Sequence, residues 1–163
     1  MKPEVSYASL IRNFVFGVED SLVSTVGLLS GIAIAEVPRE TILLTGVVLI
    51  FVEAFSMAVG SFLSEHSAEE YARQIETPFF GPLLGGLIMF FSYFISGFIP
   101  LFPYIFVTGS LALPVSVALS LITLFFLGVV GAKMSHTNIV RNGFRMLIIG
   151  GIAIGAGIAV GRI

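Results

Sequence analysis

Apolar and polar positions alternate along this chain in long blocks, and five apolar blocks are long enough to cross a lipid bilayer. A helix rises about 1.5 Å per residue, so about 20 apolar residues cover a hydrocarbon core of about 30 Å. We therefore predict an all-α, polytopic membrane protein in which residues 1–163 form one transmembrane domain. The predicted transmembrane helices cover residues 14–35, 41–63, 79–106, 111–131 and 146–160.

The polar segments between these blocks are short. Apolar residues recur at helical spacing from Tyr7 to Phe14, so residues 1–13 form either an interfacial helix or the polar end of the first span. The longest polar stretch, residues 64–78, retains helical character. Residues 1–13 and 64–78 leave no room for a second, water-soluble domain with a core of its own.

Two prolines, Pro100 and Pro103, lie within the third apolar block. Proline lacks an N–H and leaves the carbonyl of the preceding turn without its helical donor. We expect the two prolines to interrupt this span, first as a packing kink and second as a place where backbone carbonyls are free to bind an ion.

Composition supports the membrane assignment and excludes several functions. The 163 residues are 56% hydrophobic and only 11% charged, whereas soluble domains carry about 25% charged residues. The lipid bilayer is therefore the expected surrounding. Cysteine is absent, which excludes disulfides and thiolate metal sites. The net charge of −2 gives no indication of a nucleic-acid partner.

Basic residues predict the orientation of the chain. Lys and Arg are enriched in cytoplasmic segments of membrane proteins. One predicted side holds six basic residues and the other holds two, which places the N-terminus and residues 64–78 in the cytoplasm and the C-terminus outside. The compact chain favours a prokaryotic plasma membrane. The six are Lys2, Arg12, Arg73, Lys133, Arg141 and Arg145, and the two are Arg39 and Arg162.

Three carboxylates lie inside predicted spans: Glu19, Asp20 and Glu53. A charged side chain at the bilayer centre costs about 2.5–3.5 kcal/mol on insertion scales. Such residues face a bundle interior or water and commonly mark an ion pathway. Glu19 and Asp20 are adjacent and point about 100° apart, so the alternative for Glu19 is that it extends to the interface.

The estimated depths of these residues in the membrane place side chains of two helices at similar levels. Asp20 lies roughly 9 Å from the predicted cytoplasmic end of the first span, and Met57 lies at a similar depth in the second. Glu53 is one turn deeper than Met57 and shares its helix face. Ser24 lies one turn beyond Asp20. We predict that these side chains line one pathway, although an isolated methionine in an apolar span usually only fills space.

This set of side chains suits a divalent transition metal. Carboxylates supply charge, and the soft thioether of Met57 favours iron over Mg²⁺ or Ca²⁺. Carboxylates removed from water favour their protonated form, and metal binding would release those protons. The sequence therefore predicts exchange of metal for protons, with the metal as a transported substrate and no resident cofactor.

The segment 64–78 contains two further pairs at i, i+4 spacing. Glu65 pairs with Glu69, and His66 pairs with Glu70. These side chains are candidates for metal capture at the cytoplasmic mouth, and a solvated helix face is the ordinary alternative.

Three motifs resemble the vacuolar iron transporter family. Residues 17–25 (GVEDSLVST) resemble its first-span motif, and residues 53–60 (EAFSMAVG) resemble its second-span motif around Ser-Met-x-x-Gly. Residues 97–104 (GFIPLFPY) resemble its Gly-x-x-Pro-x-x-Pro stretch, and the glycine-rich residues 141–161 are similar to its last span. The resemblance covers nearly the whole chain.

The resemblance implies five spans with a cytoplasmic N-terminus, and a homodimer whose ion path lies between protomers. It implies export of Fe²⁺, and often Mn²⁺, from the cytosol in exchange for protons. The family's pore Asp corresponds to Asp20 and its pore Met to Met57, while Glu53 is the candidate for its pore Glu.

The chain departs from the family pattern in three places. Ser21 replaces a glycine, and Ser61 stands where many members have glutamate. The family usually carries a Glu-rich, metal-binding helical domain between spans 2 and 3, which this chain lacks. Any metal capture would therefore fall to a small polar set, namely Glu65, His66, Glu69, Glu70 and Glu76.

Two other functional classes compete with transport. One is a non-transporting membrane subunit or scaffold whose carboxylates pair with partner helices. The other is a membrane-embedded enzyme, which is disfavoured because the sequence offers no nucleophile–base pair and no cluster of histidines. The leading hypothesis is a transporter and not an enzyme.

Overall fold

A computed structural model describes residues 7–107 and 109–162 and confirms the all-α prediction. Five helices in the described residues are long and apolar enough to cross a membrane. A 3-10 turn, Gly109–Leu111, precedes the fourth of them. The five are α1 (Tyr7–Ile34), α2 (Arg39–Arg73), α3 (Phe80–Phe106), α4 (Ala112–Met134) and α5 (Ile139–Val160).

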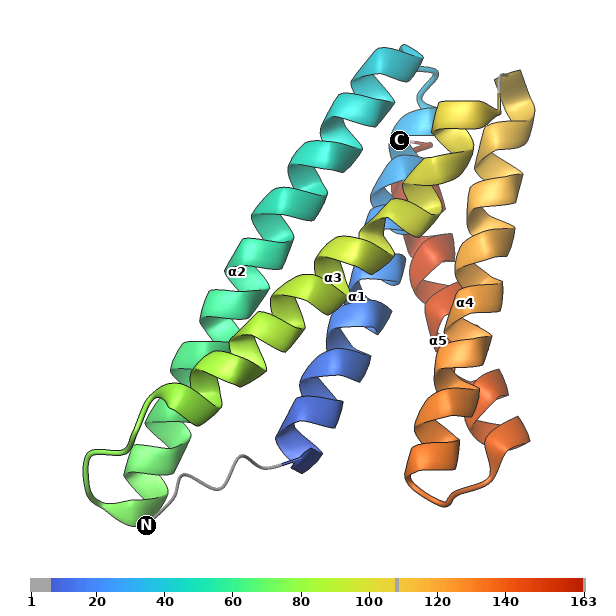
Figure 1. Cartoon of the computed structure of the whole chain (residues 1–163). Coiled ribbons are helices and arrows are strands. Elements are labelled where there is room, and N and C mark those ends of the chain that lie inside the picture. The colour runs from blue at the N-terminus through green and yellow to red at the C-terminus, as the bar shows by residue number, and fades with distance from the viewer. Residues whose placement is uncertain (1–6, 108, 163) are drawn as a thin grey trace.

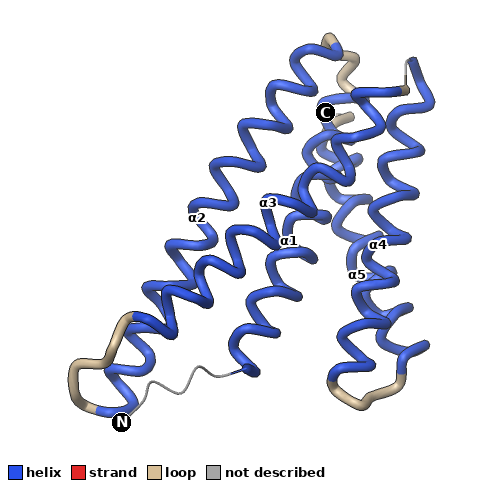
Figure 2. Tube along the Cα trace, viewed as in Figure 1, coloured by secondary structure: helices blue, strands red, loops and turns tan. Residues whose placement is uncertain are grey.

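Helix α1 is the centre of the bundle. It packs against each of the other four helices, whereas α2 packs only against α1 and α3. Helices α4 and α5 form the opposite flank, with α2 and α3 together on the first (Figures 1 and 2). The largest apolar core lies where α1, α2, α3 and α4 meet, around Leu29, Ile50 and Leu101. The two flanks meet through α1 and also through the direct contact between α3 and α4.

Three helices extend beyond their predicted bounds. Helix α1 runs without a break from Tyr7, so no boundary separates residues 7–13 from the first span; residues 1–6 lie outside the described part. Helix α2 continues to Arg73 and ends at Gln74, whose backbone is left-handed (φ 54°). Helix α5 begins at Ile139, where the Asn138 side chain accepts a hydrogen bond from the Arg141 N–H at 3.0 Å. Polar residues at these ends continue the helices into the interface.

The break expected in the third span is wrong, because α3 continues through Pro100 and Pro103; a kink within this helix stays a prediction. Two side chains bond to the backbone of α3 near its end. Ser116 on α4 donates to the Pro100 carbonyl at 2.6 Å. Arg39 donates to the carbonyls of Tyr104, at 2.7 Å, and Ile105. These bonds join α3 to α4 and α2; the carbonyls that lose their helical donor to the prolines lie one turn earlier.

Glycines bring α1 and α5 into backbone contact. A Cβ atom placed on Gly157 would lie 2.6 Å from the Gly27 carbonyl oxygen, and one on Gly161 would overlap Gly31. Gly27 and Gly31 are spaced i, i+4 on α1, and Gly157 and Gly161 have the same spacing on α5. This is the pattern by which small residues let membrane helices approach closely. The glycine-rich end of the chain is therefore a packing surface.

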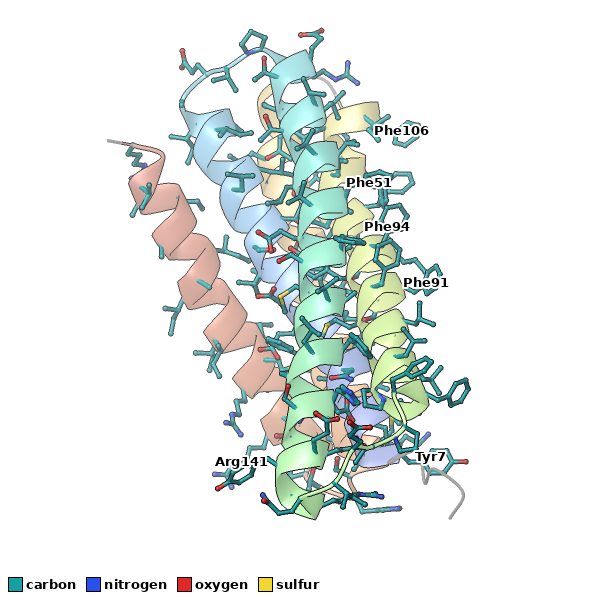
Figure 3. The ribbon with its side chains drawn as sticks, turned by 90° about the vertical axis from the view of Figure 1, so that its left-hand side faces the viewer. Tyr7, Phe51, Phe91, Phe94, Phe106 and Arg141 are labelled. Atoms are coloured by element: carbon teal, nitrogen blue, oxygen red, sulfur yellow. The ribbon has the colours of Figure 1, made fainter. Side chains whose placement is uncertain are left out.

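One flank of the bundle is aromatic. Phe51 of α2 meets Phe94 of α3 edge to face at 4.9 Å, and Phe91 and Phe106 extend from the same side of α3 (Figure 3). Phe51, Phe91 and Phe106 are more than half exposed within the protomer, as expected of residues that face lipid. Figure 3 also places Tyr7 and Arg141 at one end of the molecule, called here the basic end. Its cytoplasmic location stays a prediction.

Candidate ion pathway

Asp20 and Glu53 form the centre of the candidate site. Asp20 lies on α1 and Glu53 on α2, both half-buried, and they lie close enough for their charges to repel one another. Within the described residues, neither carboxylate has a hydrogen-bond donor or a cation as its partner. Two unpaired carboxylates whose charges repel one another within membrane-spanning helices are unfavourable unless a cation or protons neutralise them.

Tyr93 on α3 completes this centre, and sequence reasoning missed it. Its side chain is 0% exposed, and its hydroxyl lies 2.7 Å from Ser24 Oγ. It interacts electrostatically with both Asp20 and Glu53. Ser21 Oγ donates to the Tyr93 backbone carbonyl at 2.7 Å, so two serines of α1 fix this residue. The only sequence signal was a hydroxyl-bearing ring among the many phenylalanines of the third span.

Glu19 and Met57 line a cavity of about 780 Å³ between α1 and α2. Met89 contributes a second thioether to its wall. Ser56 and Gly60 also line it and are exposed, so the cavity reaches the surface of the protomer. Asp20, Glu53 and Ser24 do not line this cavity. Glu53 and Met57 are one turn apart on α2, so this helix joins the carboxylate pair to the cavity.

The polar continuation of α2 is held by its own contacts. Glu65 accepts hydrogen bonds from Ser9 and from Asn13, the latter at 3.4 Å, and lies 4.0 Å from Arg12. The Glu65 side chain is only 13% exposed. The four residues tie the first turns of α1 to α2, so Glu65 is already engaged within the protomer.

Among the other residues proposed for metal capture, His66, Glu69 and Glu70 lie further along the same helix, and Glu76 lies in the connection between α2 and α3. His66 Nε2 lies 3.5 Å from Glu70, and its other ring nitrogen lies 3.4 Å from the Thr77 hydroxyl. Glu69 is half-buried and Glu76 is exposed. Across the described residues, no three His, Cys, Asp or Glu side chains gather closely enough to hold a metal ion.

The donor set of one protomer is therefore small. It consists of two carboxylates, the neighbouring phenol and, one turn away, a thioether. Resident Ca²⁺ takes six to eight oxygen ligands, and a structural zinc site takes four ligands. A smaller set suits an ion that binds briefly and leaves, because conduction requires weak binding.

Five membrane-crossing helices around an unpaired, acidic intramembrane centre define an integral membrane protein with a polar site inside the bilayer. More specifically, the chain belongs to the VIT family, whose model matches residues 11–78 and 70–162. The two matched segments meet at residues 70–78, which include the connection between α2 and α3. This is where the resemblance implied that relatives carry an additional domain.

Individual relatives agree with this assignment. The chain is 24% identical to "Vacuolar iron transporter 1" of Oryza sativa subsp. japonica over 213 residues, covering 93% of the chain and 84% of the relative. That alignment is longer than the chain of 163 residues, so the rice protein carries residues that this chain lacks. A second rice protein, "Vacuolar iron transporter homolog 1", is 29% identical over 91% of the chain and 71% of its own length. "Vacuolar iron transporter cccA" of Arthroderma benhamiae is 38% identical over 48% of the chain and 32% of its own length.

Proposed function

We propose that this protein transports Fe²⁺, and Mn²⁺ as a second substrate, out of the cytosol in exchange for protons. Membership of the VIT family and relatives named as iron transporters support metal transport. The direction and the second metal rest on the family resemblance, and the coupling to protons rests on the chemistry of the site.

The observation that carries the proposal is the unpaired approach of Asp20 and Glu53 inside the membrane. Two like charges at this depth repel one another and have lost their hydration. A divalent cation neutralises both at once, and two protons do the same when the metal leaves. The pair therefore alternates between metal and protons, which is the minimum requirement of an exchanger.

The surrounding side chains have distinct roles in this proposal. Met57 supplies a soft ligand that favours iron over Mg²⁺ and Ca²⁺ as the ion passes along α2. Glu19 attracts the cation into the cavity that Met57 also lines. Tyr93 positions Ser24 and stands beside both carboxylates.

A second copy of the chain completes the pathway in this proposal. The cavity of Glu19 and Met57 reaches the protomer surface at Ser56 and Gly60, two small residues on an otherwise apolar face of α2. Small residues are typical of close helix contacts in membranes. A homodimer through α2 would cover this opening and place two acidic centres along one path.

The test is metal flux into proteoliposomes that contain a metal-quenched dye, with imposed pH gradients. Asp20→Asn and Glu53→Gln keep the side-chain shape and remove the charge, so we expect Fe²⁺ flux that follows the proton gradient in the wild type to disappear in both. Glu40→Gln, at an exposed position on α2 that does not line the cavity of Met57, is the matched control and should retain flux.

Two results would contradict the proposal. Wild-type protein that moves no divalent metal would exclude transport. Loss of oligomer assembly in Glu53→Gln, with no flux to lose, would support the alternative of a non-transporting subunit whose carboxylates pair with partner helices.

A further inference from the structure

A second cavity lies at the basic end, between α1, α4 and α5. Its volume is about 570 Å³. Each helix contributes residues of a single face, spaced i, i+3, i+4 and i+7. Small residues create the space, and a Cβ atom added to Gly131 would meet nothing within 4 Å. The cavity therefore results from the way the three helices pack and does not depend on one mobile side chain.

The polar lining of this cavity is rich in hydrogen-bond donors. Arg12 and Arg145 both line it, together with Ser135, Thr137 and Asn142. Asn142 Nδ2 donates to the Thr137 hydroxyl oxygen at 2.8 Å, and that hydroxyl donates to the Ala132 carbonyl at 3.4 Å, which leaves the second amide proton of Asn142 for a ligand.

The charge at the outer part of the cavity is positive. Arg145 is exposed, and among the described residues it has no acidic partner. Arg12 lies 4.0 Å from Glu65, at the limit of an ion pair, and its side chain is 66% exposed. The one acidic residue in the lining, Glu19, lies seven residues beyond Arg12, about 10 Å further along α1. A metal cation is repelled here and an anion is attracted.

We propose that this basic cavity binds the phosphate group of an anionic phospholipid. Arginine forms paired, charge-assisted hydrogen bonds with phosphate oxygens. Basic pockets between membrane helices at the headgroup level are typical sites for anionic lipids. The site goes beyond the proposed transport function, and it shares Arg12 and Glu19 with the cavity of Met57.

The surroundings of the cavity favour a lipid over a soluble phosphate compound. Ile149 lines the cavity and is 49% exposed on the outside of α5. Met146 and Val15 add apolar wall, and the neighbouring Ile148 is also exposed. Acyl chains leaving a headgroup bound at Arg145 would therefore run along an apolar helix surface that already faces lipid.

The first experiment measures lipid binding to delipidated protein by native mass spectrometry, with phosphatidylglycerol and phosphatidylcholine as the added lipids. We expect a saturable site for phosphatidylglycerol, and about tenfold weaker binding in Arg145→Gln, since a charge-assisted hydrogen bond is lost. Arg141→Gln removes the same charge from an exposed residue outside the cavity and should change binding less than about twofold. Equal losses in both variants, or equal binding of the two lipids, would overturn the proposal.

A second variant tests the cavity itself. Gly131→Leu places a side chain in open space, so it should fill the site and abolish phosphatidylglycerol binding while the protein stays folded. Gly155→Leu, where an added Cβ also meets nothing within 4 Å, is outside the cavity and should bind normally. Retained binding in Gly131→Leu would refute the assignment, and so would displacement of the lipid by millimolar inorganic phosphate. Both readouts use no metal, so they are independent of transport.

Discussion

The glycine contact between α1 and α5 makes a sharp prediction for Gly157→Ala. The new methyl group would lie 2.6 Å from the Gly27 carbonyl oxygen and 2.8 Å from its Cα, and ordinary contact begins at 3.4 Å. These atoms belong to the backbone and cannot rotate away. Helix α5 must therefore move away from α1 along their whole contact, which also separates Gly161 from Gly31.

The size of the effect follows from two opposing contributions. Overpacking a tight contact costs about 1–3 kcal/mol, while replacing glycine by alanine inside a helix gains about 0.5–1 kcal/mol. Gly155→Ala receives the gain without the clash, because an added Cβ there meets nothing within 4 Å. The gain is common to both variants, so we expect Gly157→Ala to be less stable than Gly155→Ala by the overpacking cost, about 1–3 kcal/mol.

The assay compares the two variants during unfolding in detergent, followed by size-exclusion chromatography or tyrosine fluorescence. At about 2–4 °C per kcal/mol for a chain of this size, the midpoints should differ by about 2–12 °C. Metal flux should fall as well, because Gly27 lies two turns from Asp20 on α1. Equal midpoints for the two alanine variants would refute the argument that backbone contact controls this interface.

Three further substitutions test individual contacts. Tyr93→Phe removes the 2.7 Å hydrogen bond to Ser24, so we expect a loss of about 1 kcal/mol in detergent unfolding and slower metal flux; unchanged values in both would exclude a role for the phenol. Ser116→Ala removes the 2.6 Å bond to the Pro100 carbonyl and should lower stability by about 1 kcal/mol without changing metal selectivity, and a changed selectivity would contradict a purely structural role. Glu65→Gln should loosen the first turn of α1, seen as faster hydrogen exchange near residue 9, while flux at saturating metal is retained; loss of that flux would instead place Glu65 in the pathway.

The five spans were predictable because lipid imposes a simple requirement. Each apolar block must be long enough to cross the bilayer and must satisfy its own backbone, so hydropathy alone locates the helices. The boundaries were less predictable, because polar residues at the ends of α2 and α5 continue as helix in water. The break expected at Pro100 and Pro103 was wrong because proline in a membrane helix removes a helical hydrogen bond without having to end the helix.

The candidate site was partly predictable. Counting residues from the ends of two spans gave Asp20 and Met57 similar depths and placed Glu53 one turn deeper, and in the structure the charges of Asp20 and Glu53 interact. The estimated depth of a residue does not show which face of a third helix points toward the site. Tyr93 could therefore not be recognised among its apolar neighbours. The cavity around Arg145 was also inaccessible to sequence reasoning, since it depends on which faces of three helices meet.

The length of α2 has a consequence for how this architecture is varied. Its 35 residues extend about 52 Å, well beyond a hydrocarbon core of about 30 Å, before the chain turns at Gln74 and returns at Phe80. A segment inserted at this turn would continue from the end of one long helix, and it would not disturb the buried contacts between the helices. The connection is therefore a natural grafting point, at which a sensor or metal-binding module can be added or deleted as a unit while the machinery in the lipid stays the same.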